Sequence, residues 1–150
     1  MVERDVSELA TRIDRLMRRM NAGVITRAPG FDPDRVGPLG GMILLTIADL
    51  QPVAMQRVAD MMARDKAQLS RMVSELERRG LVERASDAAD KRTSLVSLTQ
   101  QGEGFVDAIR GVLTDVLGEI LEPLNADERR SLAALLAKIE ARSPASFTTR

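Results

Sequence analysis

Hydrophobic residues recur along most of this chain at the three- and four-residue steps that are typical of amphipathic helices. The first series predicts an N-terminal helix of about six turns, and its members are Val6, Leu9, Ile13, Leu16, Met17, Met20 and Val24. The other face of this segment is rich in arginine, which is typical of a solvated helix surface and less often of a phosphate contact. The series ends in a Pro- and Gly-containing stretch, residues 27–33, which predicts a loop.

Three further helices are predicted between residues 39 and 79. The apolar segment Leu39–Leu50, flanked by Gly40-Gly41 and closed before Pro52, predicts the first. Met55–Ala63 predicts a short second helix. Lys66–Arg79 predicts the third, with Asp65 as N-cap and Gly80 as the left-handed stop. Its apolar positions fall on one face at the i, i+3, i+4, i+7 spacing; they are Leu69, Met72, Val73 and Leu76.

Two strand-like runs follow these helices. Leu81–Arg84 and Ser94–Thr99 are predicted strands, and the polar segment Asp87–Arg92 is the tip between them. The order helix, turn, helix, strand, turn, strand is that of a winged helix-turn-helix, a fold that usually binds duplex DNA. Residues 37–99 are therefore predicted to form a winged helix-turn-helix module.

The remainder of the chain is predicted to be helical. Thr99 is the expected cap of a long helix, with Glu103 as a looser capping-box partner, and Pro123 and Asn125 interrupt the helical pattern before a last helix. Residues 142–150 are expected to form a flexible tail. The apolar stripes exceed what the small module can cover. We therefore expect residues 1–26 and 100–141 to form a dimerisation region; the alternative is that these helices fold back on their own module.

Composition supports a mainly α fold with a small β-wing and localises the charge. Hydrophobic residues make up 44% of the chain but aromatic residues only 2%, so the core must be aliphatic. The net charge is zero, yet Met55–Arg92 holds nine Arg/Lys against seven Asp/Glu, and Thr93–Arg150 holds six against eight. A mildly basic module is weak support for an anion-binding face.

Missing residue types exclude several kinds of chemistry. The sequence has no Cys and no His, which excludes disulfides, thiol redox sensing, His-based acid–base catalysis and the common zinc sites. No nucleophile–base constellation is visible, so no enzymatic activity, metal or cofactor is expected. No signal peptide or membrane-spanning run is seen, which predicts a cytoplasmic protein with no membrane partner.

Short motifs in the module resemble those of the MarR (multiple antibiotic resistance regulator) family of bacterial transcription factors. The matching segments lie between Leu39 and Gly102 and are Val58-Ala59, Gln68-Leu69-Ser70-Arg71, Leu76–Arg84 (LERRGLVER), Asp87–Arg92 (DAADKR) and Leu98–Gly102 (LTQQG). Two positions depart from the family pattern. Ala54 stands where Ser or Thr often caps the first module helix, and Ala88 stands where Pro is common in the wing tip.

The resemblance implies which residues contact DNA. On the recognition helix these are Lys66, Gln68, Ser70, Arg71 and Ser74, and on the wing they are Asp90, Lys91 and Arg92. Gln68 can pair with adenine and Arg71 with guanine or phosphate in the major groove. Arg92 resembles the family arginine that enters the minor groove, and Asp90 the acid that orients the arginines. The alternative is an ordinary solvated helix face and a surface hairpin charge.

The resemblance also implies a small organic effector bound between the dimer helices and the module. The lining residues would be Met20, Val24, Met42, Leu45, Phe105 and Ile109. The alternative for each of them is plain aliphatic core, since Met fills cores as readily as it lines adaptable pockets.

The sequence thus predicts a dimeric, sequence-specific DNA-binding regulator that represses a nearby operon from a palindromic operator and is released by an effector. One competing hypothesis is a winged helix that contacts protein and has lost DNA binding. The presence of Arg71, Asp90 and Arg92 argues against it, and a salt-dependent gel shift separates the two.

Overall fold

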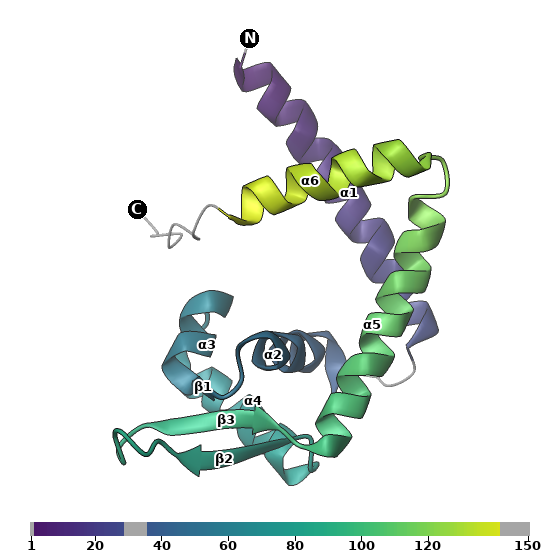
Figure 1. Ribbon diagram of the computed structural model, residues 1–150. Helices are drawn as coiled ribbons and strands as arrows, with labels where there is room; N and C mark the ends of the chain where they lie inside the picture. The colour runs from purple at the N-terminus through teal and green to yellow at the C-terminus, as the bar shows by residue number, and fades with distance from the viewer. Residues whose placement is uncertain (1, 29–35, 142–150) are drawn as a thin grey trace.

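The structure, a computed structural model, describes residues 2–28 and 36–141 (Figure 1). Within these ranges the elements are α1 (Val2–Arg27), α2 (Gly37–Leu50), β1 (Val53–Ala54), α3 (Met55–Met62), α4 (Lys66–Arg78), β2 (Val82–Ser86), β3 (Ser94–Leu98), α5 (Gln100–Ile120) and α6 (Ala126–Glu140). The fold is mainly α with a small β-wing, as predicted. Of the loop expected at residues 27–33, Arg27 instead ends α1, and residues 29–33 lie outside the described residues, as does the expected tail at residues 142–150.

One aliphatic core joins α2, α3, α4, the sheet and the start of α5. Ile43, Leu44 and Ile47 of α2 are fully buried in it, together with Val73 of α4 and Val96 of β3. The apolar face predicted for α4 is the face that packs here, because its positions recur with the helical period. Burial of this face fixes which side of α4 is left for solvent.

Local polar bonds set where the helices begin and end. Asp65 caps α4 by accepting a hydrogen bond from the Gln68 N–H at 3.0 Å, and Gly80 follows α4 at a φ of 72°; both were predicted. Thr99 caps α5 by accepting from the Gly102 N–H at 3.0 Å. Ala54 precedes α3 without a side-chain cap, as its methyl group requires.

The wing is part of a three-stranded antiparallel sheet in the order β1-β3-β2. The predicted strands are confirmed with shifted ends, and Arg84 of β2 lies opposite Val96 of β3. β1, which pairs Val53 with Val96, was not predicted from the sequence. A strand of two residues is too short to produce an alternating pattern. The predicted position of Gly40 and Gly41 at a flank of α2 is wrong, because α2 begins at Gly37 and buries both glycines.

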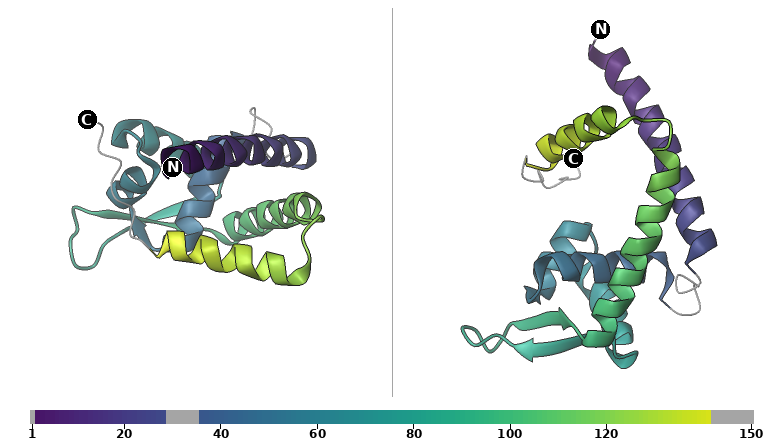
Figure 2. Two further views of the ribbon diagram at one scale, coloured as in Figure 1. Left: turned by 90° about the horizontal axis from the view of Figure 1, so that it is seen from above. Right: turned by 45° about the vertical axis from the view of Figure 1, so that its right-hand side comes forward.

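Long helices carry the chain away from the module. α5 leaves the end of β3 and runs beside α1 (Figure 2), and the lower part of this pair shares an apolar cluster that includes Val24, Ile109 and Val116. α6 starts at the turn after the far end of α5 and runs away from that helix (Figure 1), and it has no buried residue. None of the helices that the structure describes combines the length and the apolar character of a membrane span.

Candidate nucleic-acid interface

The helix α4 presents the residues that the sequence analysis assigned to the major groove. Lys66, Gln68 and Arg71 are exposed, whereas Ser70 and Ser74 are half-buried. An α-helix fits the major groove of B-form DNA, and amide and guanidinium groups pair with base edges there. The exposed face of α4 therefore has the chemistry of a recognition helix.

Ser74 is engaged within the protein. Its hydroxyl donates to the Ser70 carbonyl at 2.9 Å and accepts from Arg84 Nη2 at 2.9 Å. The helical spacing alone placed Ser74 on the outer face, because it does not show that a strand of the wing covers this side of the helix.

The wing tip is organised by two aspartates. Asp87 accepts from the Ala89 N–H at 2.9 Å, and Asp90 accepts from the Arg92 N–H at 3.0 Å and the Thr93 hydroxyl at 3.1 Å. Asp90 thus fixes the backbone at Arg92, and within the described residues its carboxylate forms no ion pair with an arginine side chain. This differs from the expected contact between Asp90 and the guanidinium groups. Asp90, Lys91 and Arg92 all face solvent.

A cavity of about 340 Å³ lies where α3, α4 and the wing meet. Its lining residues are Ala54, Met55, Gln56, Lys66, Ser70, Arg84, Arg92, Thr93 and Ser94. The lining contains three cationic side chains and no carboxylate, so it favours an anion such as a backbone phosphate. The structure thus brings Lys66, Ser70 and Arg92 together, while Gln68, Arg71, Ser74, Asp90 and Lys91 lie outside this lining.

Arg84 and Gln56 are two of the lining residues that were not assigned to the site from the sequence. Arg84 lies within the quoted LERRGLVER motif, but strand alternation does not show which helix its side chain reaches. Gln56 carries no recognisable signal in the sequence. Both side chains line the cavity because the wing packs close to α3 and α4 in the folded chain.

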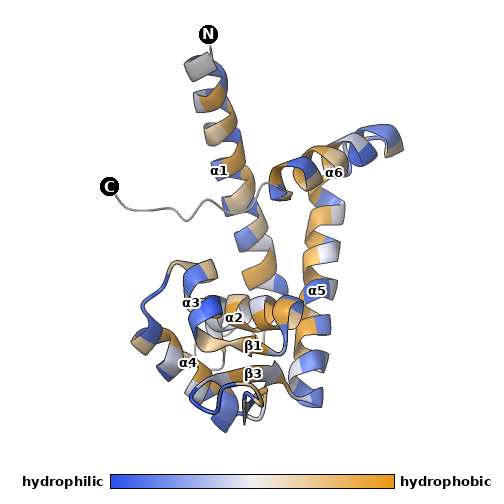
Figure 3. Ribbon diagram, turned by 60° about the vertical axis from the view of Figure 1, so that its left-hand side comes forward, coloured by the Kyte–Doolittle hydropathy of each residue, from blue (hydrophilic) through white to orange (hydrophobic). Residues whose placement is uncertain are grey.

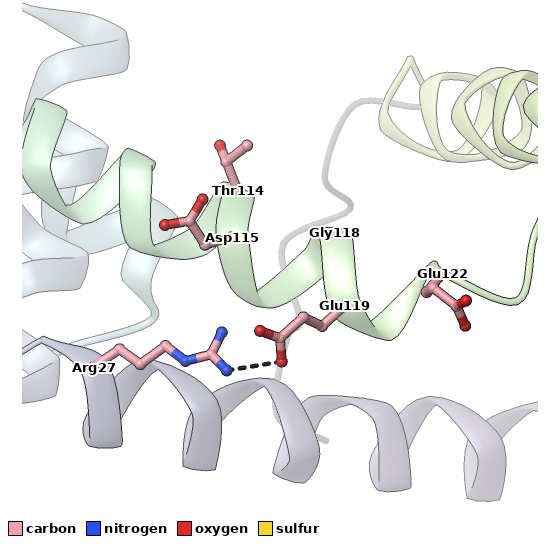
Figure 4. A pocket seen from close by; sticks show the side chains of 6 residues that line it. All are labelled: Arg27, Thr114, Asp115, Gly118, Glu119 and Glu122. Atoms are coloured by element: carbon pink, nitrogen blue, oxygen red, sulfur yellow. Dashed lines mark hydrogen bonds and ion pairs between the residues drawn. The ribbon is translucent and has the colours of Figure 1, made fainter.

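Away from this face, one ion pair joins α1 to α5. Arg27 Nη2 lies 2.7 Å from Glu119 Oε2 (Figure 4). The hydrogen bond from Arg27 and its charge lower the pKa of Glu119, and the same contacts raise the pKa of Arg27. The pair borders an open cavity of about 670 Å³, and Glu122 on the same rim points away from Arg27.

The residues assigned to an effector pocket form part of the packed interior, with one exception. Met20, Val24, Leu45, Phe105 and Ile109 belong to one apolar cluster between α1, α2 and α5. Met42 lies outside it, with 56% of its surface exposed. The structure brings five of the six residues together as core.

Two helices expose apolar stripes (Figure 3). On α1 the exposed residues include Val6, Leu9, Ile13, Leu16 and Met17, and on α6 they are Leu135, Leu136 and Ile139. Their exposed fractions run from 41% at Leu16 to 69% at Ile139. A contiguous apolar stripe of this kind marks a protein-contact surface.

Comparison with known proteins places the module in a family. A family model described as a winged helix DNA-binding domain matches residues 36–102. The transcriptional regulator HosA of Escherichia coli O157:H7 is 34% identical over 97 residues, which span 65% of this chain and 72% of HosA.

Solved structures extend the likeness over most of the chain. Wild-type MarR from E. coli in its apo form is 26% identical, with a TM-score of 0.64, and the alignment covers 85% of this chain and 96% of MarR. A cysteine-to-serine mutant of MarR from E. coli complexed with operator DNA aligns at a TM-score of 0.67 over 91% of this chain and 96% of that one. Its identity of 23% supports the fold alone.

The helices α3 and α4 and the wing together define a winged-helix DNA-binding domain. The chain belongs to the MarR family of transcriptional regulators, as the resemblance in the sequence predicted.

Proposed function

We propose that the protein is a homodimeric regulator that binds a palindromic DNA operator in the cytoplasm and represses a nearby operon. The observation that carries the proposal is the joint presentation of α4 and the wing. Lys66, Gln68 and Arg71 are exposed on α4, and Lys66 and Arg92 line one cation-rich cavity between helix and wing. MarR and MepR structures with bound DNA, described as operator DNA and an oligodeoxyribonucleotide, support a duplex partner.

The division of labour in this proposal follows the chain. Residues 37–99 form the DNA-binding module, and residues 1–26 and 100–141 form the dimerisation region. The exposed stripes of α1 and α6 support this, because a second copy would remove them from water. A two-fold dimer presents two recognition helices, which suits a palindrome with half-sites about 10 base pairs apart.

The proposal includes release by a small organic effector. Its basis is the family resemblance together with one apolar cluster. This cluster contains Met20 and Val24 of α1 and Phe105 of α5, and it lies where these long helices meet α2 of the module. A ligand there would alter the separation of the two recognition helices without touching a base. A thermal-shift screen of anionic aromatic compounds, followed by operator binding in their presence, tests this part separately.

Selection of bound sequences from random duplexes tests the main proposal. The expected result is a palindromic consensus, and a match to it upstream of the protein's own gene or a neighbouring one. Selected sites that lack any consensus, or lone half-sites bound by monomers, would contradict it. A winged helix used only for protein contacts would show no salt-dependent shift of any duplex.

A further inference from the structure

Arg84 extends from strand β2 of the wing onto the recognition helix α4. Its Nη2 donates to the Ser70 carbonyl at 3.2 Å and to the Ser74 hydroxyl at 2.9 Å. Its Nε lies 3.4 Å from Glu77 Oε2. Side-chain bonds between β2 and α4 are thus concentrated in one guanidinium group.

The three partners of Arg84 lie along one side of α4. Ser70, Ser74 and Glu77 occupy positions i, i+4 and i+7, which lie on the same face of an α-helix over two turns. A planar guanidinium with fixed donors contacts such a row in few orientations. Rotation of α4 about its axis, or sliding of the wing along it, would break these bonds together.

The ion pair and the Nε atom of Arg84 add little stability to the fold. Glu77 is 41% exposed, and an exposed ion pair contributes little because water screens it. The Nε atom of Arg84 is buried and has no hydrogen-bond partner among the described residues, and such an atom is destabilising. The main contribution of Arg84 is therefore to fix where the wing lies on α4, through its hydrogen bonds to Ser70 and Ser74.

We propose that Arg84 is a positioning residue for DNA recognition, and that Ser74 acts as its partner and not as a DNA contact. The bond between them holds α4 and the wing at one relative rotation, so that Arg71 and Arg92 can enter neighbouring grooves of one duplex together. This inference rests on the proposed function, since it concerns how the two DNA-contacting elements are aligned.

A direct phosphate contact is the competing role for Arg84, because its side chain also lines the cation-rich cavity. The two roles differ in their salt dependence. Loss of one phosphate contact lowers the slope of log affinity against log salt by about 0.9 on any duplex. Loss of alignment weakens binding only where both grooves must be matched, and it leaves that slope unchanged on unrelated DNA.

The test compares three variants of the full chain with a matched control. The variants are Arg84→Met, Ser74→Ala and the two combined. Ser74→Ala removes one hydroxyl from a helix and is expected to fold even if Arg84→Met does not. The control is Arg79→Met, which removes an arginine of similar exposure, 34% against 27%, whose side chain, among the described residues, bonds Glu75 four residues before it. Affinities are measured for the selected operator and for an unrelated duplex of equal length over a range of salt.

Arg84→Met should weaken operator binding about tenfold, because α4 and the wing are then no longer held at one relative rotation and must be ordered when the duplex binds. The unrelated duplex should be bound as by the wild type, with the same salt slope. Ser74→Ala should act in the same direction, and the combined variant should be no worse than Arg84→Met. Equal losses on both duplexes with a slope lower by about 0.9 would overturn the proposal, as would additive losses from the two substitutions.

Amide hydrogen exchange without DNA separates this inference from the proposed function. Both Arg84→Met and Ser74→Ala should speed exchange in β2 and in the middle and C-terminal part of α4, where Arg84 contacts the helix, while Arg79→Met should not. Unchanged exchange in both variants would show that the contact does not hold the wing. If instead the wild type prefers no duplex, the proposed function fails while the exchange result still reports on the contact.

Discussion

Two arginines at the interface differ in the kind of DNA contact that their surroundings permit. Arg71 is exposed on the middle of α4, from where its side chain would reach the floor of the major groove in the proposed DNA complex. Arg92 lies on the wing, with its backbone N–H held by Asp90. The backbone anchor limits where the Arg92 side chain can start, although it leaves the guanidinium free in solvent.

Arg71→Ala should therefore cost about 1–3 kcal/mol of operator binding and relax base preference at one position. Arg92→Ala should weaken binding most on operators with narrow, A·T-rich flanks, where the minor groove attracts cations most strongly. Titrations of both variants against a panel of operators with altered bases and altered flanks measure this. Equal losses on every sequence would reduce both residues to phosphate contacts.

At Gly102, one added carbon atom would prevent the close packing of the start of α5. A Cβ placed on it would lie 1.9 Å from the Leu81 carbonyl oxygen and 2.9 Å from the Leu81 carbonyl carbon. The start of α5 can approach Leu81, the residue before β2, this closely only without a side chain. The residue thus sets the distance between the module and the helix that leaves it.

Gly102→Ala should lower the free energy of unfolding by about 1–3 kcal/mol, because backbone atoms must shift to admit the methyl group. Gly104→Ala is the matched control, since a Cβ there meets no atom within 4 Å. It should raise stability by about 0.5–1 kcal/mol through helix propensity. Urea denaturation of both variants at one protein concentration is the measurement. A Gly102→Ala protein as stable as the control would contradict the close approach.

At the scale of elements, local chemistry predicted α4 well and β1 not at all. The apolar period and the caps of α4 are written in adjacent residues such as Asp65 and Leu69, so both its limits and its buried face follow from the sequence. β1 exists because β3 offers an edge to Val53. Such pairing depends on a partner more than forty residues away and leaves no local pattern.

The candidate site was predictable to the same extent. Exposure of Lys66, Gln68 and Arg71 follows from the helical period of α4, and the turn at Asp90 follows from its aspartate. The engagement of Ser74 by Arg84 does not follow, because it depends on how β2 lies across the helix. Periodicity identifies which residues leave the core, and only the assembled elements show which of them then meet another surface.

The contact between α1 and α5 gives a prediction in pH. The pKa of Glu119 is lowered in the folded protein by its hydrogen bond with Arg27. A carboxyl with a lowered folded pKa stabilises the fold above its ordinary pKa, and this stabilisation is lost as the pH falls through the lowered value. Arg27 has a raised pKa and stays charged throughout.

Glu119→Gln should therefore be less stable than the wild type near neutral pH by a small amount, since the pair faces solvent. The difference should shrink as the pH falls and vanish in strong acid. Thermal unfolding of both proteins between neutral and acidic pH measures it. Glu122 lies on the same cavity rim and does not pair with Arg27. Glu122→Gln should therefore be more stable than Glu119→Gln near neutral pH by the same amount as the wild type is. A difference between Glu119→Gln and wild type that is constant with pH would exclude the ion pair as its cause.

At the scale of the whole molecule, the described chain carries an excess of apolar helix surface. The core of the module is closed by α2, α3, α4, the sheet and the start of α5. Within residues 2–28 and 36–141, α6 has no buried residue, and the apolar side chains on the N-terminal part of α1 stay exposed. A dimer that buries these surfaces would set the separation of the two copies of α4. Binding of the second copy would then be effectively intramolecular, which raises affinity without any new contact to DNA.

Removal of residues 127–150 should accordingly abolish specific operator binding at physiological salt, although Lys66, Gln68, Arg71 and Arg92 are untouched. A monomer keeps only a few phosphate contacts, whose contribution falls steeply with salt. Removal of residues 142–150 alone is the matched control, because it keeps α6 whole. Light scattering alongside an operator titration gives the oligomeric state and the affinity of each protein.

A point variant separates loss of the interface from loss of chain. Leu135→Glu combined with Ile139→Glu places charges on residues that are 60% and 69% exposed in the single chain, so folding of the chain itself should not suffer. Ala137→Glu puts the same charge on the opposite side of α6, at 100° per residue. The double variant should become monomeric and lose the operator, while Ala137→Glu remains dimeric and binds it. If the double variant stays folded, is monomeric and still binds the operator with full affinity, α6 has no part in spacing the recognition helices.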